Sequence, residues 1–590
     1  MNDESLSRRL TLLGVVLIGI SLVLMGKLVW FQYQMDPKTK ATLEENRENR
    51  LFQKVEVQPD RGLIFDRNGH LLATNSFDYQ VGISPNMVLD RQQVAAQLAP
   101  LVGLPEDQIY HALEPDENGV YSSWVLLASR VDFATGQAIA DLDITGIDLD
   151  PRPIRVYPQG KLTAQLVGLF AGAEDIKNSR GYYGVEGFYD TLLAGQSKRV
   201  TTSTIPLLEE SETNTDVRDG ISLVLTIDRD LQNLAQEVLN DAIESDQTAT
   251  GGTILIMNPR NGEILAIANY PQFDPDDAEG SDLDLAKNQA VQDFYEPGSI
   301  FKVLTMAVAL DLGTHDLSWT YHDPGCMEGR GNIICNWDDR SRGDPDFAQV
   351  FIESLNTGTA TIFEQIGPTQ VYPKLRDFGI GTPTGVDLEG ETRGILNQPG
   401  DLIWSENQFL TTSFGQGVAV SPIQMLTAVN AIANDGLIMQ PHIVKARIDG
   451  NEVIEATPSA SHRPISEEAA HTARDIMVRV LQENQDIEFD FPGYTIAGKT
   501  GTAEIPMPGG YEPFQAGNTI ASFVGFLPAD DPVVSVLVKL DRPQDYWGSK
   551  TAAPVFETLL RRLVVLMEIP PDNLRYTLVA EGGNPFGREY

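Results

Sequence analysis

The sequence predicts a mixed α+β protein with a single N-terminal transmembrane helix and two folded domains. A long apolar run, residues 10–31, stands near the start of the chain. Residues 51–215 then mix short alternating strands with helical stretches, and a strand, an amphipathic helix and a hairpin follow in close succession. The chain has 590 residues, which is enough for several domains of ordinary size.

Charge and composition exclude several classes of protein. The chain has 43 Lys and Arg against 83 Asp and Glu, a formal net charge of −40. Because phosphate binding depends largely on Lys and Arg, no nucleic-acid partner is expected. The two cysteines and seven histidines include no cysteine-rich zinc pattern and no HExxH spacing. A catalytic metal is therefore not expected, and no other cofactor is expected.

The apolar run predicts a membrane anchor. It extends from Leu10 to Phe31, about the 20 residues that a transmembrane helix needs, and only Lys27 interrupts it. Arg8 and Arg9 come just before it, which predicts that residues 1–9 stay in the cytoplasm and that the chain after residue 35 is exported. No small-residue cleavage pattern follows. An uncleaved, single-pass anchor is therefore predicted.

The exported part divides into a stalk with a first domain, residues 32–215, and a second domain, residues 216–565. Residues 36–50 are polar and helix-prone, as a stalk beside the membrane would be. Residues 195–220 are polar with few apolar positions, which predicts a boundary near residue 215.

The second domain is expected to begin with a strand and a helix. The helix should start near Asp228, whose carboxylate can cap it. Two apolar runs then flank Pro259-Arg260-Asn261-Gly262, and Asn-Gly is typical of a hairpin turn. This hairpin is expected to belong to the central sheet of the domain.

Ser299 and Lys302 form the first candidate catalytic pair. Pro297 and Gly298 break the preceding chain, so a helix should begin near Ser299 and place its hydroxyl at a helix N-terminus. Lys302 lies on the same helical face, between the apolar Phe301 and Val303, where burial could leave its amine neutral enough to act as a base. A serine in this position could equally be only a helix cap.

Two further motifs carry polar groups. Ser354-Leu355-Asn356 lies between two helical patterns, although Ser84 and Ser405 start the same Ser-x-Asn spacing. Lys499-Thr500-Gly501-Thr502 occurs once and follows a strand-like run. Its lysine and hydroxyl groups can hold a carboxylate, and its glycine would let a substrate backbone approach. In a regular strand Lys499 and Gly501 share one face, and Thr500 and Thr502 share the other unless a bulge intervenes.

Residues 493–500 also match the phosphate-loop pattern GxxxxGK(S/T), which is typical of nucleotide hydrolases. Such a loop needs flexible residues between its glycines and a helix that starts at the lysine. Here the intervening residues are YTIA, and the continuation GTAEIPMPGG cannot form a helix. A nucleotide-hydrolase function is therefore rejected.

Taken in order, Ser299-x-x-Lys302, Ser354-x-Asn356 and Lys499-Thr-Gly501 resemble the three active-site motifs of penicillin-binding proteins and serine β-lactamases. Further similarity to the transpeptidase domain lies in YEPGSIFK, AGKTGTAE and residues 413–425, 522–532 and 552–556. Upstream, residues 61–69, 155–168 and 184–195 resemble the N-terminal pedestal of the class B, monofunctional enzymes. The resemblance covers about residues 51–565 and leaves 566–590 as a C-terminal extension.

The resemblance implies a transpeptidase domain built on an antiparallel sheet flanked by helices, and serine acyl-transfer chemistry. Ser299, deprotonated by Lys302, would attack the D-Ala-D-Ala bond of a peptidoglycan stem peptide, and Ser354 would protonate the leaving amine. Asn356 would hold a substrate amide, and Lys499, Thr500 and Thr502 would bind the terminal carboxylate beside Gly501. The N–H groups of Ser299 and Thr502 would form the oxyanion hole. β-Lactams would trap Ser299.

The resemblance also implies partners and a disulfide. Class B enzymes usually work beside a polytopic glycan polymerase and other membrane proteins of the divisome or elongasome, and residues 413–425 favour the cell-division branch. Cys326 and Cys335 stand in a loop that resembles a cysteine-containing insertion of these enzymes, and after export they could form a disulfide.

Three other functions use related sequences. A β-lactamase or a β-lactam sensor shares the three motifs but does not need the pedestal and the anchor in this arrangement. A bifunctional enzyme would need a glycosyltransferase domain, whereas residues 36–215 resemble the pedestal. A purely structural scaffold would not need all three motifs intact.

Overall fold

The computed structural model describes residues 3–34, 40, 52–57, 59–171, 179–203, 218–246, 248–275, 282–584 and 586. Contacts divide the chain into two units, one of residues 1–59 and 196–219 and the other of residues 60–195 and 220–590. Residues 60–195 of the expected first domain therefore group with the second domain. Of the predicted stalk, residues 36–50, only Lys40 lies within the described residues.

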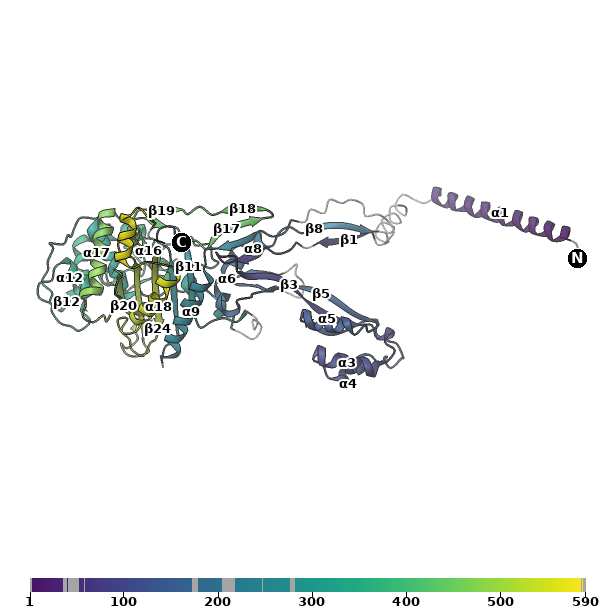
Figure 1. The fold of residues 1–590 in the computed structure, drawn as a ribbon, viewed down its shortest axis with the longest axis horizontal. Coiled ribbons are helices and arrows are strands. Elements are labelled where there is room, and N and C mark those ends of the chain that lie inside the picture. The colour runs from purple at the N-terminus through teal and green to yellow at the C-terminus, as the bar shows by residue number, and fades with distance from the viewer. Residues whose placement is uncertain are drawn as a thin grey trace. The chain divides into compact units, whose positions relative to one another are not determined.

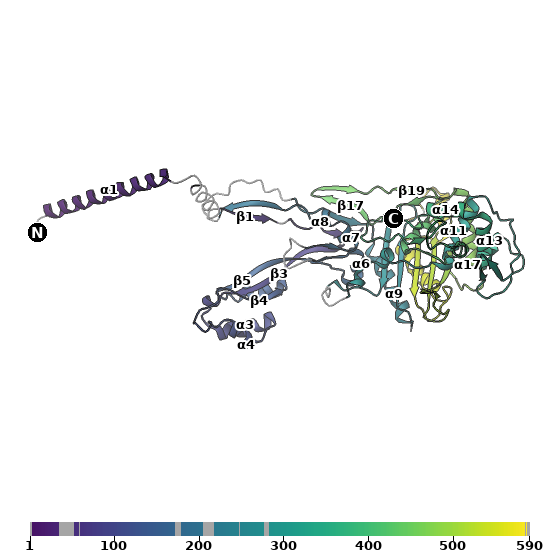
Figure 2. The same ribbon diagram turned by 180° about the vertical axis from the view of Figure 1, so that it is seen from behind.

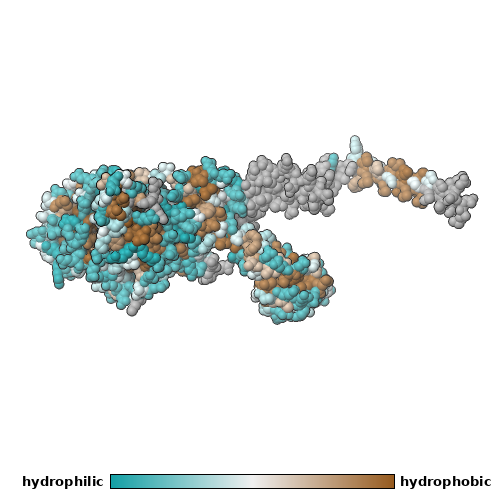
Figure 3. Space-filling model, in the orientation of Figure 1, coloured by the Kyte–Doolittle hydropathy of each residue, from teal (hydrophilic) through white to brown (hydrophobic). Residues whose placement is uncertain are grey.

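The N-terminal apolar run forms one helix, α1 (Asp3–Gln34). Within it, Thr11–Phe31 is a span of 21 residues with a mean hydropathy of 2.5, and none of it is buried. Figure 3 shows the apolar side chains of this helix in brown. The helix is long and apolar enough to cross a membrane, as the sequence predicts, and the side on which each end lies stays a prediction.

Two strands of the first unit pair although they are distant in the sequence. β1 (Phe52–Val57) runs antiparallel to β8 (Lys198–Ser203), with Phe52 opposite Ser203. The polar stretch 195–220 thus contains a strand, which its low apolar content did not predict. Val200, Thr201 and Thr202 are β-branched residues, which favour extended backbone. The expected boundary near residue 215 lies outside the described residues.

An α+β lobe opens the second unit. Its long strand β3 pairs with β5 from Thr74 opposite Val156 to Ile83 opposite Ile147, and with β4 as well. Three helices pack against these strands around a small core of their own that includes Leu98 and Ile109. The elements are β3 (Leu71–Ile83), α3 (Arg91–Val102), α4 (Glu106–Ala112), β4 (Val125–Val131), α5 (Phe133–Asp141) and β5 (Ile147–Val156).

A seven-stranded sheet joins segments from three parts of the sequence. Its order is β18-β17-β9-β2-β3-β4, with β5 paired to β3. The added strands are β2 (Ile64–Phe65), β9 (Ser222–Leu225), β17 (Val444–Asp449) and β18 (Glu452–Glu455). Beside it the fully buried Glu186 accepts hydrogen bonds from Arg61 Nε at 2.8 Å and Arg155 Nε at 2.7 Å.

Several short elements complete the first part of the second unit. They are η1 (Pro85–Met87), η2 (Gly160–Leu162), α6 (Ala164–Val167), β6 (Leu169–Ala171), β7 (Arg180–Tyr182), α7 (Gly184–Phe188) and α8 (Asp190–Leu193). Among these elements, helix α7 carries Glu186, the carboxylate that binds Arg61 and Arg155.

The second sheet has five antiparallel strands in the order β11-β10-β24-β23-β20. They are β10 (Gly251–Met257), β11 (Ile264–Tyr270), β20 (Ala497–Glu504), β23 (Thr519–Leu527) and β24 (Val534–Asp541). β10 and β11 are the predicted hairpin. Helix α9 (Arg229–Glu244) precedes them, and Asp228 caps it by accepting from the N–H groups of Asp230 and Leu231.

Helices cover both faces of this sheet. α9 and α18 (Ala552–Leu566) pack together on one face, where they contact β10, β11, β23 and β24. α11 (Lys302–Asp311), α16 (Pro422–Ala433) and α17 (Glu467–Glu483) contact one another on the other face. α9 and α18 are seen with β24 in Figure 1, and α11 and α17 are labelled in Figure 2. The expected antiparallel sheet flanked by helices is confirmed.

The remaining elements surround this core. They are η5 (Leu283–Ala286), α10 (Gln289–Gln292), η6 (Gly298–Phe301), β12 (Cys326–Gly329), β13 (Asn332–Cys335), α12 (Phe347–Ile352), α13 (Asn356–Ile366), α14 (Pro368–Asp377), β14 (Ile395–Leu396), α15 (Glu406–Thr412), β15 (Val418–Ala419), β16 (Ile438–Met439), β19 (Ala460–His462), β21 (Pro506–Met507), β22 (Gly510–Tyr511) and α19 (Asp572–Ala580).

Part of the expected C-terminal extension contacts the segments that precede β20 and follow β23. The Asp572 carboxylate accepts hydrogen bonds from the N–H and the hydroxyl of Thr495, both at 2.7 Å. Arg575 pairs with Asp572 and with Asp530. Because β20 begins at Ala497, helix α19 fixes the segment that leads into this strand.

Candidate active site

The turn that carries Ser299 is tighter than the sequence predicts. Ser299 lies in the 3-10 turn η6 (Gly298–Phe301), and the α-helix α11 begins only at Lys302. Gly298 has φ 59°, and a Cβ there would lie 2.4 Å from the carbonyl oxygen of Thr502. Glycine is therefore required at residue 298, because the turn presses directly against strand β20.

Lys302 is completely buried at the start of α11. Its Nζ donates to the carbonyl oxygen of Ser354 at 2.7 Å and to Asn356 Oδ1 at 2.7 Å, and it lies 3.2 Å from Ser354 Oγ. Burial, and then the charge of Lys499, lower the pKa of Lys302 well below its usual value. The neutral amine that a proton acceptor needs is thus favoured.

No hydrogen bond joins Ser299 to Lys302 among the described residues, since the three contacts of Lys302 Nζ go to Ser354 and Asn356. The Ser299 side chain is half-buried, one helical turn before the lysine. Such contacts often form only when substrate is bound.

Ser354 and Asn356 lie at the junction of α12 and α13. Ser354 has φ 54°, a left-handed conformation that is uncommon outside glycine and that clusters at functional sites. Asn356 is the first residue of α13, and its Nδ2 donates to the carbonyl oxygen of Cys335 at 2.9 Å. Of the three Ser-x-Asn spacings in the sequence, this one meets Lys302.

Lys499 approaches the same serine from strand β20. It is 1% exposed, and its Nζ donates to Ser354 Oγ at 3.1 Å and to the carbonyl oxygen of Thr500 at 3.2 Å. Burial lowers the pKa of Lys499 to about 7. The Ser354 hydroxyl therefore lies between two buried amines and can pass a proton from one to the other.

The register of β20 answers the question that the sequence leaves open. β20 pairs with β23 without a bulge, from Ala497 opposite Phe526 to Glu504 opposite Thr519. Lys499 and Gly501 are buried on one face, and Thr500 and Thr502 are half-exposed on the other. The segment 493–500 therefore runs into a strand, and no helix starts at Lys499, so the structure agrees with the rejection of a phosphate loop.

Gly501 and Thr502 make contacts that the sequence does not show. A Cβ at residue 501 would lie 2.5 Å from Ser522 Oγ and 2.9 Å from Ile300 Cγ2, so glycine lets the serine turn pack onto β20. The Thr502 hydroxyl accepts a hydrogen bond from the N–H of Gly548 at 3.0 Å. The glycine thus serves the packing of the protein itself.

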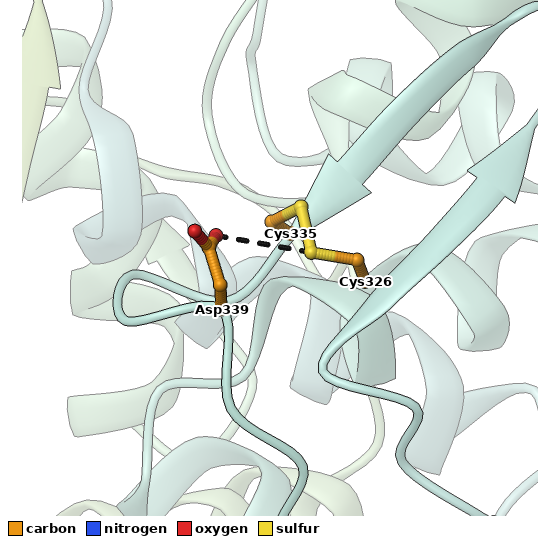
Figure 4. A group of neighbouring side chains, drawn as sticks. All are labelled: Cys326, Cys335 and Asp339. Atoms are coloured by element: carbon orange, nitrogen blue, oxygen red, sulfur yellow. Dashed lines mark hydrogen bonds between the residues drawn. A yellow bond between two sulfur atoms is a disulfide. The ribbon is translucent and has the colours of Figure 1, made fainter.

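Cys326 and Cys335 form a disulfide across the open end of the β12–β13 hairpin. Figure 4 shows the Asp339 carboxylate beside it, 3.8 Å from Cys326 Sγ. These three residues are the one cluster of potential metal ligands within the described residues, and the disulfide occupies both sulfur atoms. Through the Cys335 carbonyl and Asn356, the hairpin end is connected to Lys302.

Sequence reasoning missed Glu296, three residues before Ser299. Its Oε1 accepts from the N–H of Gly417 at 3.0 Å, and its Oε2 accepts from the Tyr511 hydroxyl at 3.0 Å. Burial raises the pKa of Glu296 to about 7. A carboxylate directly before a Pro-Gly turn was visible in the sequence, but its partners lie far along the chain.

Two family models match the chain. Residues 252–561 match the penicillin-binding protein transpeptidase domain, and residues 56–225 match the penicillin-binding protein dimerisation domain. These two ranges contain the five-stranded sheet with its motifs and the α+β lobe, respectively.

Several known proteins are similar to this chain along most of their length. Stage V sporulation protein D of Bacillus subtilis is 32% identical over 584 residues, 97% of this chain and 88% of that protein. The peptidoglycan D,D-transpeptidase FtsI of Escherichia coli K12 is 28% identical over 575 residues, 95% of this chain and 92% of that protein. Crystalline penicillin-binding protein 3 of Mycobacterium tuberculosis, complexed with aztreonam, is 25% identical with a TM-score of 0.66, covering 88% of this chain and 98% of that one.

Proposed function

The chain belongs to the penicillin-binding protein family, and on this premise we propose that Ser299 is the nucleophile of its transpeptidase reaction. The protein is a serine D,D-transpeptidase that cross-links peptidoglycan stem peptides and is acylated by β-lactams. The observation that carries the assignment of residues is the convergence of two buried lysines on Ser354, directly beside the Ser299 turn.

In the first step Lys302 removes the proton of Ser299, and the Ser299 oxygen attacks the carbonyl of the penultimate D-alanine. The lowered pKa of Lys302 supports this role, because it favours the neutral amine, which can accept a proton. The proton then passes from Lys302 through the Ser354 hydroxyl to the leaving amine of the last D-alanine. Asn356 holds Lys302 through its Oδ1 and is proposed to hold a substrate amide as well.

The oxyanion is proposed to bind the N–H groups of Ser299 and Thr502. In an antiparallel strand the N–H and C=O of one residue point to the same side. The Thr502 carbonyl approaches Gly298, so the Thr502 N–H also points toward the serine turn from the free edge of β20. Two donors would then converge where charge develops on the substrate oxygen.

The terminal carboxylate of the donor peptide is proposed to bind Lys499, Thr500 and Thr502, next to Gly501. Thr500 and Thr502 present their side chains on the half-exposed face of β20, while the buried Lys499 amine supplies the charge when it is protonated. After the last D-alanine leaves, the amine of a neighbouring stem peptide attacks the acyl-enzyme, which forms the cross-link and regenerates Ser299.

We also propose a topology and partners. Residues 1–9 would lie in the cytoplasm, residues 10–31 would cross the membrane, and the domains expected at 32–215 and 216–565, with the extension 566–590, would lie outside. The apolar helix α1 supports the anchor. The partner would be a polytopic glycan polymerase within the divisome or elongasome. A reporter fused after residue 40 should be active only outside the cytoplasm, and a mature N-terminus beyond residue 30 would contradict an uncleaved anchor.

Labelling with fluorescent penicillin, followed by peptide mapping, tests the proposed nucleophile. The label should map to Ser299, and Ser299→Ala should remove it while the protein stays folded by circular dichroism. A label that maps to Ser354 or persists in Ser299→Ala would contradict the assignment. Slow release of the label is expected of a transpeptidase, whereas rapid hydrolysis would indicate a β-lactamase.

A further inference from the structure

Glu296 lies at a crossing of three elements that meet beside Ser299. Residues 295–298 run alongside residues 415–420, and backbone hydrogen bonds join them at both ends. Tyr295 and Val420 exchange two such bonds at 3.0 and 2.9 Å, and the N–H of Gly298 donates to the carbonyl oxygen of Gly415 at 3.1 Å. Between these bonds, the N–H of Gly417 is satisfied by the Glu296 side chain.

The third element is the hairpin of β21 and β22, which leaves β20 directly after Glu504. Tyr511 at its end donates to Glu296, and Arg542 pairs with the next residue, Glu512, at 2.6 Å. The hairpin is thus fixed at two neighbouring points. One of them is a side chain only three residues from the nucleophile, with the rigid Pro297 in between.

We infer that Glu296 is a positioning residue for the acylation of Ser299, which it serves by holding the serine turn against residues 415–420 and the β21–β22 hairpin. The inference rests on the proposed role of Ser299. If the turn shifted, the N–H groups proposed for the oxyanion hole would no longer converge, because Gly298 and Thr502 are already in contact. Small displacements of reacting groups are costly, up to about a hundredfold in rate.

The charge on Glu296 should matter to this role. An ionised carboxylate accepts stronger hydrogen bonds than a neutral acid does, so Glu296 holds Gly417 and Tyr511 most strongly when it is ionised. The titratable groups that face it are Glu504 on β20, whose charge raises the pKa of Glu296, and Tyr511 on β22, whose hydrogen bond lowers it. Residues 415–420 face it with the uncharged N–H of Gly417, and the amide of Gln416 binds Glu504.

The test is the second-order rate constant for acylation of the full-length protein by fluorescent penicillin between pH 5.5 and 9. Glu296→Gln keeps the size of the side chain but cannot ionise. We expect the ratio of the wild-type rate to the Glu296→Gln rate to rise from near one at acidic pH to roughly tenfold above pH 8, because only the wild-type side chain becomes ionised. The effects of Lys302 and Lys499 on the rate are common to both proteins and cancel in the ratio. A ratio that does not vary with pH would indicate a merely structural role and would overturn the inference.

Two neighbouring substitutions provide matched controls with opposite signs. Glu504→Gln removes the repelling charge and should move the midpoint of the pH-dependent step to lower pH, whereas Tyr511→Phe removes a hydrogen bond to the carboxylate and should move it to higher pH. Both retain Glu296, so if Glu296→Gln fails to fold, the ratio of the wild-type rate to the rate of each variant still reports the shift while the effects of Lys302 and Lys499 cancel. Midpoints that stay fixed, or move in the same direction, would overturn the inference. If the wild-type protein is not labelled at Ser299, that result would instead refute the proposed nucleophile.

Discussion

Two buried clusters of ionisable side chains in this protein differ in how their charges are paired. Near the seven-stranded sheet, the carboxylate of Glu186 lies between Arg61 and Arg155, so that each buried charge has an opposite partner. Beside Ser299, the buried amines of Lys302 and Lys499 share a neutral serine hydroxyl, and the charge of Lys499 adds to the cost of ionising Lys302. Compensated charges fit a structural role, whereas uncompensated like charges shift pKa values toward those that catalysis needs.

The largest loss of stability is expected when the compensated cluster is broken. Glu186→Gln would leave Arg155, whose side chain is only 2% exposed, without a carboxylate, and would leave Arg61 with Asp190 alone. We expect the free energy of unfolding to fall by roughly 3–5 kcal/mol, as when one partner of a buried ion pair is removed. Urea unfolding measures it. An unchanged midpoint would show that the arginines are solvated or find other partners.

The lysine cluster should respond to substitution in the opposite way. Lys302→Met removes an amine whose burial disfavours its charged form, so we expect stability at pH 7 to be unchanged or higher while penicillin acylation is lost. The same urea experiment on this variant is the matched control for Glu186→Gln. A loss of stability as large as that of Glu186→Gln would remove the distinction between the two clusters.

Stability should also depend on pH through Lys499. Its pKa is about 7 when folded and near 10.5 when unfolded, so between these values the unfolded chain binds more protons. The stability contributed by Lys499 is therefore fully present above pH 10.5, falls as the pH falls, and is lost below about pH 7. The melting temperature should rise less between pH 7 and 9 in Lys499→Met than in the wild type. An identical rise in both proteins would contradict the lowered pKa.

A smaller effect is expected from the disulfide that borders the lysine cluster. Replacing Cys326 and Cys335 with serine opens a loop with a sequence separation of 9, which should lower stability by roughly 2–3 kcal/mol if the whole loop unfolds with the domain. The acylation rate should fall only a few-fold, because Asn356 contacts the backbone of Cys335 and not its sulfur. Full loss of acylation in the folded double variant would mean that the hairpin controls Lys302 directly.

The sequence predicted the features that depend on local patterns. The apolar helix, the Asp228 cap and the β10–β11 hairpin follow from hydropathy, capping and turn chemistry, and all three are present. The three motifs were found from residue type and order, and the structure brings Lys302, Ser354, Asn356 and Lys499 together.

The sequence could not predict features that are fixed by distant contacts. Ser354 adopts a positive φ, although it is neither a glycine nor an asparagine, the residues for which the sequence would indicate this conformation. The 3-10 turn at Ser299 depends on its packing against β20. Glu296 meets Tyr511, which is 215 residues away, and β1 meets β8 from the far end of the first domain. Contacts at such separations depend on the complete fold, which no local pattern encodes.

The proposal that Lys302 in the lysine cluster acts as a neutral base is tested most directly by comparing the acylation rates of Lys302→Arg and Lys302→Ala. Arginine keeps the positive charge, but with a pKa above about 12 it cannot give up its proton. If Lys302 is the neutral base, both variants should lose acylation by a similar factor, on the order of 10²–10⁴. Acylation of Lys302→Arg at close to the wild-type rate would show that Lys302 acts only through its charge, and Lys499 would then be the next candidate for the base.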